Sequence, residues 1–507
     1  MARVISVFLP TWPTDRLRRK AGDAAPPGDA PLIIVGRDRS RRIVTAADAT
    51  AQALGLRVGM PVTKAQALVP GLIIEPADPK ADVESLERLA LWVLQRIAPI
   101  VAVDPPDGIV IDSTGADHLH GGEAAMLDAL IGRLTLSGVS ARAAIADSWG
   151  AAHALARFRS NPALIAPPGA GTPMLAPLPI EALRLPPGIP AGLRALGFSS
   201  IGDLIGQPRA PLTLRFGPEL CRRLDQALGQ GAEPIEPLRP EGMIKARRVF
   251  AEPIAAAETI ARYIGKLVAT LCGELETRGL GARRLDLLCH RIDNRIETVR
   301  IGLARPVREP KRLTRLLCDK IETIDPGLGI EIMTLAATLA EPISERQAAS
   351  SLIAPPEPDL SGLIDTLANR VGARAIYRFA PVASDVPERS ARRIPALAED
   401  TGVGWPDQWP RPSRLLPRPE PIETMALLPD HPPNWISWRG VRRRVRRADG
   451  PERVFGEWWK RDAELVAVRD YFRIEDDAGE RFWIFRAGDG EDAATGSHRW
   501  FLHGIFG

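Results

Sequence analysis

The sequence predicts an α+β protein built from several domains. Three observations lead to this prediction. The 507 residues are more than one ordinary hydrophobic core holds, so about three to five domains are expected. Strand and helix signals alternate over 1–165 and again over 240–342, with a shorter helical segment between them. The rest of the chain is rich in proline and tryptophan, which indicates a separate C-terminal extension.

The N-terminal elements follow from apolar periodicity. Residues 3–9 form a short apolar run closed by Pro10 and Pro13, which predicts a buried strand. A helix is predicted where apolar residues recur on one face, at Leu86, Leu89, Val93, Leu94 and Ile97. Further on, the pattern predicts strands at 108–112 and 142–146 and a helix at 122–137.

Composition excludes several classes of protein. The 66 Lys and Arg residues against 62 Asp and Glu give a net charge of +4, which excludes a uniformly basic coat protein but permits local basic surfaces. No apolar run reaches the roughly 18 residues of a membrane helix, and no secretory leader is seen. The four cysteines lack C-x-x-C spacing, so we expect buried thiols in a reducing cytoplasm and no metal or cofactor: Cys221, Cys272, Cys289 and Cys318.

Two regions contain candidate DNA-binding residues. Leu193-Arg-Ala-Leu-Gly197 followed by Ile201-Gly202 predicts a helix-hairpin-helix, in which glycines let backbone N–H groups approach a phosphate. An ordinary helical turn is the alternative. The second region has basic residues near strand-like runs, which favour either a sheet that tracks phosphates or a solvated face: Lys245, Arg247, Arg248, Arg283 and Arg284.

The C-terminal region combines proline, tryptophan and arginine. Prolines are so dense over 406–421 that we expect an extended arm or linker there. Beyond it, Arg442-Arg-Arg-Val-Arg-Arg447 lies between Trp438 and Trp458. Arginines interleaved with aromatic residues suit single-stranded DNA or an acidic protein partner, and a solvated face is the third interpretation. The tryptophans themselves suit either a small aromatic core or a binding surface.

One segment resembles a known family. Ile43-Val-Thr-Ala-Ala-Asp-Ala-Thr-Ala-Gln52, with Leu54-Gly-Leu-Arg-Val-Gly-Met-Pro61 after it, resembles the fingers of Y-family translesion DNA polymerases. The resemblance covers about 1–342. It implies a right-hand fold followed by two further regions: palm at 1–10 and 71–165, fingers at 11–70, helix-hairpin-helix thumb at 166–238, little finger at 239–342, a clamp-peptide and linker region at 343–422, and a partner-binding region at 423–507.

The sequence departs from that family where the chemistry is done. Nucleotidyl transfer needs two divalent cations held by carboxylates. The family places an Asp on the first strand, where this chain has Phe8, and an Asp-Glu pair where this chain has Asp107-Gly108. The family's triphosphate contacts align with Ala49, Gln52 and His153. A catalytic alternative is a true polymerase that uses relocated carboxylates: Asp104, Asp107 and Asp112.

The chain therefore resembles the non-catalytic branch of the family found in bacterial mutagenesis cassettes. That resemblance implies a cytoplasmic scaffold at damaged replication sites that binds primer-template or single-stranded DNA. Its implied partners are the beta sliding clamp, the RecA-like protein ImuA and an error-prone DnaE-type polymerase; an adaptor without DNA contact is the third hypothesis. Expected docking residues are Gln347, Leu352 and Ile353 for the clamp and, for protein partners, Arg442, Arg443, Arg444, Arg446, Arg447, Trp458 and Trp459.

Overall fold

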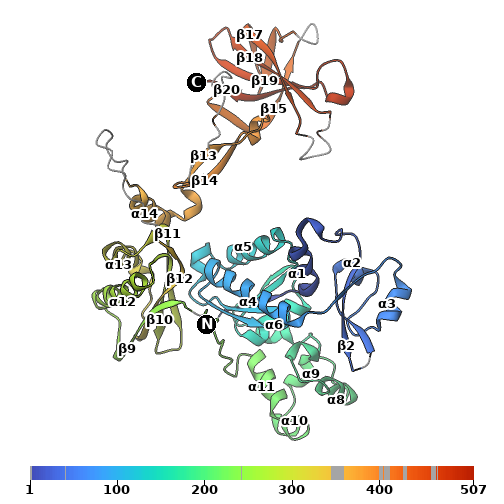
Figure 1. Cartoon of the computed structure of the whole chain (residues 1–507), viewed down its shortest axis with the longest axis vertical. Helices are drawn as coiled ribbons and strands as arrows, with labels where there is room; N and C mark the ends of the chain where they lie inside the picture. The colour runs from blue at the N-terminus through green and yellow to red at the C-terminus, as the bar shows by residue number, and fades with distance from the viewer. Residues whose placement is uncertain are drawn as a thin grey trace. The chain divides into compact units, whose positions relative to one another are not determined.

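The computed structural model (Figure 1) describes most of the chain. It covers residues 3–39, 41–240, 242–343, 359–398, 404, 411–425, 431–457, 464 and 466–507. The chain divides into two compact units, Met1–Asn369 and Arg370–Gly507. The first unit contains three sheets and the helical thumb, and the second contains a β-hairpin and a closed barrel.

A five-stranded palm sheet forms the centre of the first unit. Its order is β5-β6-β1-β7-β8, with strands Ile100–Asp104, Gly108–Asp112, Val4–Phe8, Arg142–Ala146 and Ala163–Ile165. Side chains of β1 alternate between two cores because successive residues of a strand point to opposite faces. Ile5 and Val7 pack with α4 (Pro79–Arg96) and α5 (Glu123–Leu136). Val4 packs on the other face, with α6 (Trp149–Phe158).

The fingers form a small sheet with its own core. The order is β3-β2-β4, with strands Arg41–Ala47, Leu32–Asp38 and Ile73–Pro76, and the two covering helices are α2 (Ala49–Ala53) and α3 (Val62–Leu68). The predicted fingers range, 11–70, is wrong at both ends. Trp12 of α1 (Trp12–Ala21) is buried in the palm core, and β4 lies beyond residue 70 but pairs with β2 in parallel.

The thumb is helical and shares a core with one face of the palm. Its helices are α7 Gly171–Leu175, α8 Ile189–Ala195, α9 Ile201–Ile205, α10 Arg209–Phe216 and α11 Pro218–Ala227. Helices α8 and α9 are joined by a tight turn at Gly197, whose φ of 86° favours glycine. The predicted helix, glycine turn and helix are therefore present.

The little finger is a four-stranded antiparallel sheet with helices on one face. The order is β11-β10-β12-β9, with strands Ile296–Val307, Leu280–Arg291, Ile330–Pro342 and Ile244–Ile254, packed against α12 (Ala257–Thr277) and α13 (Pro310–Cys318). Helix α14 (Ser361–Val371) lies along the edge strand β11. Asp365 accepts the N–H of Ala304, and Asn369 hydrogen-bonds the backbone of Gly302 in both directions. These side chains satisfy an otherwise unpaired sheet edge.

The second unit contains a closed antiparallel barrel of six strands. They are β15 Arg414–Thr424, β16 Trp435–Trp438, β17 Val441–Phe455, β18 Val468–Asp476, β19 Arg481–Ala487 and β20 Trp500–Ile505, and a hairpin of β13 (Tyr377–Pro381) and β14 (Ala391–Pro395) precedes them. The expected arm over 406–421 is wrong from Arg414 onward. Pro417 and Pro419 fit into β15 because its pairing with β20 shifts between Leu415 and Glu420, so neither needs a ladder N–H there.

Aromatic residues contribute to two cores of the second unit, with Phe472, Phe482 and Trp500 in one and Tyr471, Trp483 and Phe485 in the other. Trp483 stacks on Tyr471 with ring centroids 4.1 Å apart, and both are buried. The aromatic core interpretation is therefore right for these residues.

The four cysteines are free. Cys221, Cys272 and Cys289 are buried as predicted, but Cys318 is only half-buried, which corrects the prediction for that thiol. None of the helices in the described parts of the chain has the length and apolar character of a membrane span.

Candidate functional site: a polymerase-like palm without its carboxylate cluster

The centre of the site is a pair of residues on neighbouring palm strands. Phe8, at the end of β1, lies directly opposite Gly108, at the start of β6. Gly108 also lies opposite Asp104 of β5. A Cβ added at Gly108 would lie 2.9 Å from the Asp104 carbonyl oxygen and 3.1 Å from Arg157 Nη2. The space beside Gly108 is therefore already filled by protein atoms.

The guanidinium of Arg157 occupies this corner of the palm. It donates from Nη2 to Asp107 Oδ1 across 2.6 Å and lies 3.9 Å from Asp104 Oδ2. Its carbon Cζ also lies 4.7 Å from the centroid of the Phe8 ring, within cation–π range. Arg157 extends from α6, one turn after His153, so both side chains are on the same face of the helix. One guanidinium thus pairs with Asp107, lies close to Asp104 and covers the aromatic ring.

Burial controls protonation around Arg157. It raises the pKa of Asp104 above the usual range, and the nearby Arg157 only partly opposes this effect. Burial, reinforced by the charges of Arg157, Arg184 and Arg223, lowers the pKa of His153 to about 2. His153 is therefore neutral at physiological pH, and its 3.7 Å approach to Asp104 is not an ion pair.

These residues do not fit two divalent cations. Of the three positions predicted to correspond to the family's carboxylates, two are Phe8 and Gly108, and the third, Asp107, is paired with Arg157. Asp112 lies at the other end of β6, about 13 Å from Gly108 at the usual rise per residue. Within the described residues, no three His, Cys, Asp or Glu side chains come together as a possible metal site.

The predicted triphosphate positions also carry no positive charge. Ala49 is the first residue of α2, and Gln52 donates its side-chain amide to the Ala47 carbonyl across 2.8 Å. Asp48 caps the same helix by accepting the Ala51 N–H, and it pairs with Arg18 at 2.7 Å. A carboxylate at this helix N-terminus occupies the place that would favour a phosphate.

The hairpin glycines have structural tasks. Gly197 donates its N–H to Arg194, and Gly202 donates to the Ala176 carbonyl across 2.8 Å. Between them, the N–H groups of Ser199 and Ser200 donate to Asp203. These hydrogen bonds lower the pKa of Asp203 to about 2, so its carboxylate stays charged. A DNA phosphate would compete with this internal anion, and DNA contact by the hairpin stays a prediction.

The basic residues of the little finger fall into two groups. Lys245, Arg247 and Arg248 are exposed on β9, an edge strand of the sheet. Arg283 of β10 pairs with Glu341 at 3.3 Å. Arg284 is half-buried, and burial with neighbouring positive charges lowers its pKa to about 10, so it remains charged. The β9 group is the one with side chains free to track a phosphate backbone.

The residues predicted to bind the clamp and the protein partners lie after the little finger, beyond residue 343. Gln347, Leu352 and Ile353 fall outside the described residues, as do Trp458 and Trp459. The arginine run is on β17: Arg443 pairs with Asp476 at 2.6 Å, while Arg442, Arg444, Arg446 and Arg447 are exposed.

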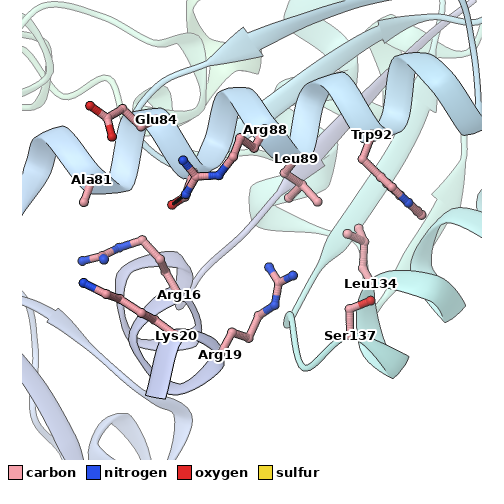
Figure 2. Close-up of a pocket in the computed structure, with 11 residues that line it drawn as sticks. Arg16, Arg19, Lys20, Ala81, Glu84, Arg88, Leu89, Trp92, Leu134 and Ser137 are labelled. Carbon is pink, nitrogen blue, oxygen red and sulfur yellow. Dashed lines mark hydrogen bonds between the residues drawn. The ribbon is translucent and has the colours of Figure 1, made fainter. Parts of the chain in front are cut away.

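Sequence reasoning missed a basic hollow on the helical side of the palm. Figure 2 shows Arg16, Arg19 and Lys20 of α1 facing α4, which carries Arg88, with Leu89, Trp92 and Leu134 beside these cations. The volume of the hollow is about 550 Å³, and it is lined by Arg16, Arg19, Lys20, Arg88, Leu89, Trp92 and Leu134 among others. Arg16 is neutralised by Asp82 at 2.5 Å. The basic run at 16–20 is the sequence feature that could have predicted this hollow. Arg157 was also missed, because nothing in the sequence links it to Asp107.

Comparisons with known proteins found matching family models, curated relatives and solved structures. Residues 28–157 match the impB/mucB/samB family and residues 243–350 match the C-terminal domain of that family. Protein ImuB of Caulobacter vibrioides (strain NA1000 / CB15N) is 46% identical over 464 residues, which cover 90% of this chain and 100% of the relative. DNA polymerase IV of Dehalococcoides mccartyi (strain CBDB1) is 28% identical over 50% of this chain and 66% of its own length. Among solved structures, a post-insertion binary complex of Dbh DNA polymerase has 16% identity and a TM-score of 0.39, covering 66% of this chain and 98% of that chain.

Proposed function

Since the chain belongs to the ImuB family, we propose that it is a catalytically inactive, polymerase-like scaffold in damage-induced mutagenesis and translesion synthesis. The observation that carries this proposal is the position of Arg157, which binds Asp107 beside Phe8 and Gly108 where the family's cation ligands would converge. A positive guanidinium at this place repels a divalent cation and uses the carboxylate that would bind it.

The expected effect on catalysis is large. A metal clamp stabilises the developing charge of nucleotidyl transfer by several kcal/mol, and each 1.4 kcal/mol is about a tenfold change in rate. Losing the clamp therefore lowers the rate by about a thousandfold or more. The neutral groups at Ala49, Gln52 and His153 would further weaken the binding of an incoming triphosphate.

DNA binding is assigned to the first unit, with recognition of shape and phosphate and little selection for base sequence. The exposed cations Lys245 and Arg247 support this assignment because they share one face of an edge strand, and Arg248 adds a charge on the opposite face, beside the Tyr263 ring. Such contacts release counterions, so the affinity would fall steeply with salt.

Recruitment is the second half of the proposed function. The peptide around Gln347, Leu352 and Ile353 would enter the beta sliding clamp, with the amide in a polar pocket and the aliphatic side chains in an apolar cleft. The C-terminal unit would contact the RecA-like ImuA and the error-prone DnaE-type polymerase that performs synthesis. These contacts would concentrate the protein at damaged replication sites on the nucleoid.

A primer-extension assay tests the proposal. Purified protein with Mg²⁺ or Mn²⁺, all four nucleoside triphosphates and a primer-template should give no extension, while a Y-family polymerase assayed in parallel extends. Extension that is abolished by Asp107→Ala would establish the catalytic alternative with Asp104, Asp107 and Asp112. A salt-dependent gel shift with the same primer-template tests DNA binding, and its absence would favour an adaptor that does not contact DNA.

A further inference from the structure

The barrel of the second unit displays a row of arginines on one outer face. Side chains alternate along β17, so that Arg443 and Val445 lie against the barrel core while Arg442, Arg444 and Arg446 are exposed. We call these three exposed residues the arginine row. Residues two apart on a strand are separated by about 6.8 Å. The row therefore presents three guanidinium groups along about 14 Å, with a register shift of the strand beside Arg446.

The arginine row lacks internal neutralisation. Among the described residues, no carboxylate lies within ion-pair distance of Arg442, Arg444 or Arg446. Other arginines of the same barrel are paired: Arg443 with Asp476, Arg453 with Asp470, and Arg473 with Asp449. On the neighbouring strands, Glu423 lies opposite Ser437, Glu475 lies opposite Arg447, and Asp476, opposite Val445, is already paired with Arg443. The row thus keeps a net positive charge that the fold does not use.

An aromatic side chain lies beside the row. Trp435 of β16 faces Arg444 across the two strands, and Arg442 Cζ lies 4.2 Å from the centroid of the Trp435 ring. Ile436, between Trp435 and Ser437, is fully buried, so Trp435 belongs to the outer face. A guanidinium plane over an indole forms a flat surface on which a nucleobase can stack.

We propose that this outer face of β16 and β17 binds single-stranded nucleic acid. Phosphates would pair with the arginine row and a base would stack at Trp435 and Arg442. The proposal adds a second DNA-binding surface to the proposed function. It rests on that function in one respect, which is that the single-stranded ligand would be the exposed template strand.

Two features favour a nucleic acid over an acidic protein. Three unpaired cations follow one another along one outer strand face, which suits a backbone with one anion in every repeat. A specific protein partner is usually anchored by apolar side chains in well-packed pockets, whereas the groups next to the row are a flat indole and the exposed Val441. An acidic partner is therefore the competing outcome of the test.

The test is fluorescence anisotropy of the full-length protein with a labelled oligo-dT of about 20 nucleotides at several salt concentrations. Replacing Arg442, Arg444 and Arg446 together with alanine should weaken binding at least tenfold and reduce the slope of log K against log salt by about 2, since three single-strand contacts are lost. Trp435→Ala should weaken binding at least fivefold because a stacked base loses its support. Circular dichroism should show that each variant stays folded.

A matched control separates this surface from general charge effects. Arg444→Ala should weaken oligo-dT binding at least threefold, whereas Arg473→Ala on the adjacent strand, whose guanidinium is already paired with Asp449, should change it less than twofold. Unchanged oligo-dT affinity in the triple variant would overturn the proposal. Polyglutamate serves as a model of an acidic protein partner, and a triple variant that loses polyglutamate binding but keeps oligo-dT binding would also overturn it. Duplex binding through Lys245, Arg247 and Arg248 is measured separately, so failure of that part of the proposed function is distinguishable.

Discussion

Phe8 and Gly108 lie opposite each other on adjacent antiparallel strands of the palm. The resemblance to Y-family polymerases predicts that both positions correspond to those of cation ligands. Here one is an aromatic ring under the Arg157 guanidinium, and the other has no room for a side chain. The two changes fit each other, because Arg157 contacts the ring and also fills the space beside the glycine.

Adding one methyl group tests the space beside Gly108. Gly108→Ala should lower the free energy of unfolding by about 1–3 kcal/mol, since its Cβ would meet the Asp104 backbone at 2.9 Å. Gly132→Ala is the control: it lies in α5 with no atom near its added Cβ and should be neutral or stabilising by up to about 1 kcal/mol. Urea denaturation measures both, and equal effects would show that Gly108 is not crowded.

Removing the guanidinium tests its role as a counterion. Arg157→Ala should destabilise the protein by about 2 kcal/mol or more, because the buried Asp104 and the partly exposed Asp107 lose their neighbouring positive charge. Arg159→Ala, an exposed arginine two residues later, should stay within about 0.5 kcal/mol of the parent. A neutral result for Arg157→Ala in thermal and urea denaturation would refute the counterion role.

The buried His153 predicts a pH dependence. Its pKa is lowered to about 2 from its ordinary 6.5, so below pH 6.5 the unfolded chain takes up a proton that the native protein does not. The native state therefore loses stability as the pH falls. His153→Gln removes this loss. From pH 6.5 to 5, the free energy of unfolding of the parent should therefore fall by about 1.5 kcal/mol more than that of the variant. A difference that stays constant across that range would mean that His153 is not buried as a neutral ring.

The little-finger cations predict a change in salt dependence with duplex DNA. Replacing Lys245, Arg247 and Arg248 with alanine should reduce the slope of log K against log salt by about 2–3, the value for three duplex phosphate contacts. Arg283→Ala should have a smaller effect per residue because Glu341 already pairs with Arg283. Filter binding or anisotropy at several salt concentrations measures the slope, and an unchanged slope would place the DNA elsewhere.

The clamp peptide is tested by substitution. Alanine at Gln347, Leu352 and Ile353 should abolish co-precipitation with the beta sliding clamp, because the polar and apolar anchors are removed together. Leu360→Ala, at an exposed leucine a few residues later, is the control and should leave co-precipitation intact. Clamp binding that survives the triple substitution would move the contact to another segment.

Much of the fold was predictable because its signals are local. The strand at 108–112 and the helix at 122–137 follow from apolar runs and periodicity, and the structure has β6 at Gly108–Asp112 and α5 at Glu123–Leu136. The barrel was not predicted, because Pro417 and Pro419 argue against a strand when the pairing register is unknown. Closure of a barrel depends on pairing between strands far apart in the sequence, such as β15 and β20.

The sequence predicted that Phe8 and Asp107-Gly108 belong to one site, but it did not predict the arginine beside them. The resemblance located Phe8 and Asp107-Gly108, and the structure places them side by side. Arg157 is 50 residues from Asp107 and gave no signal, since an arginine in an amphipathic helix usually faces solvent. For the hairpin, the sequence predicted the glycine turn between two helices. It did not predict that Asp203 accepts the neighbouring backbone N–H groups.

The most direct measurement is anomalous diffraction from crystals soaked with Mn²⁺ and a nucleoside triphosphate. The account predicts no manganese peak between Phe8 and Asp107 and an Arg157 guanidinium that remains bound to Asp107. Two manganese ions at that place, with Arg157 displaced, would contradict it.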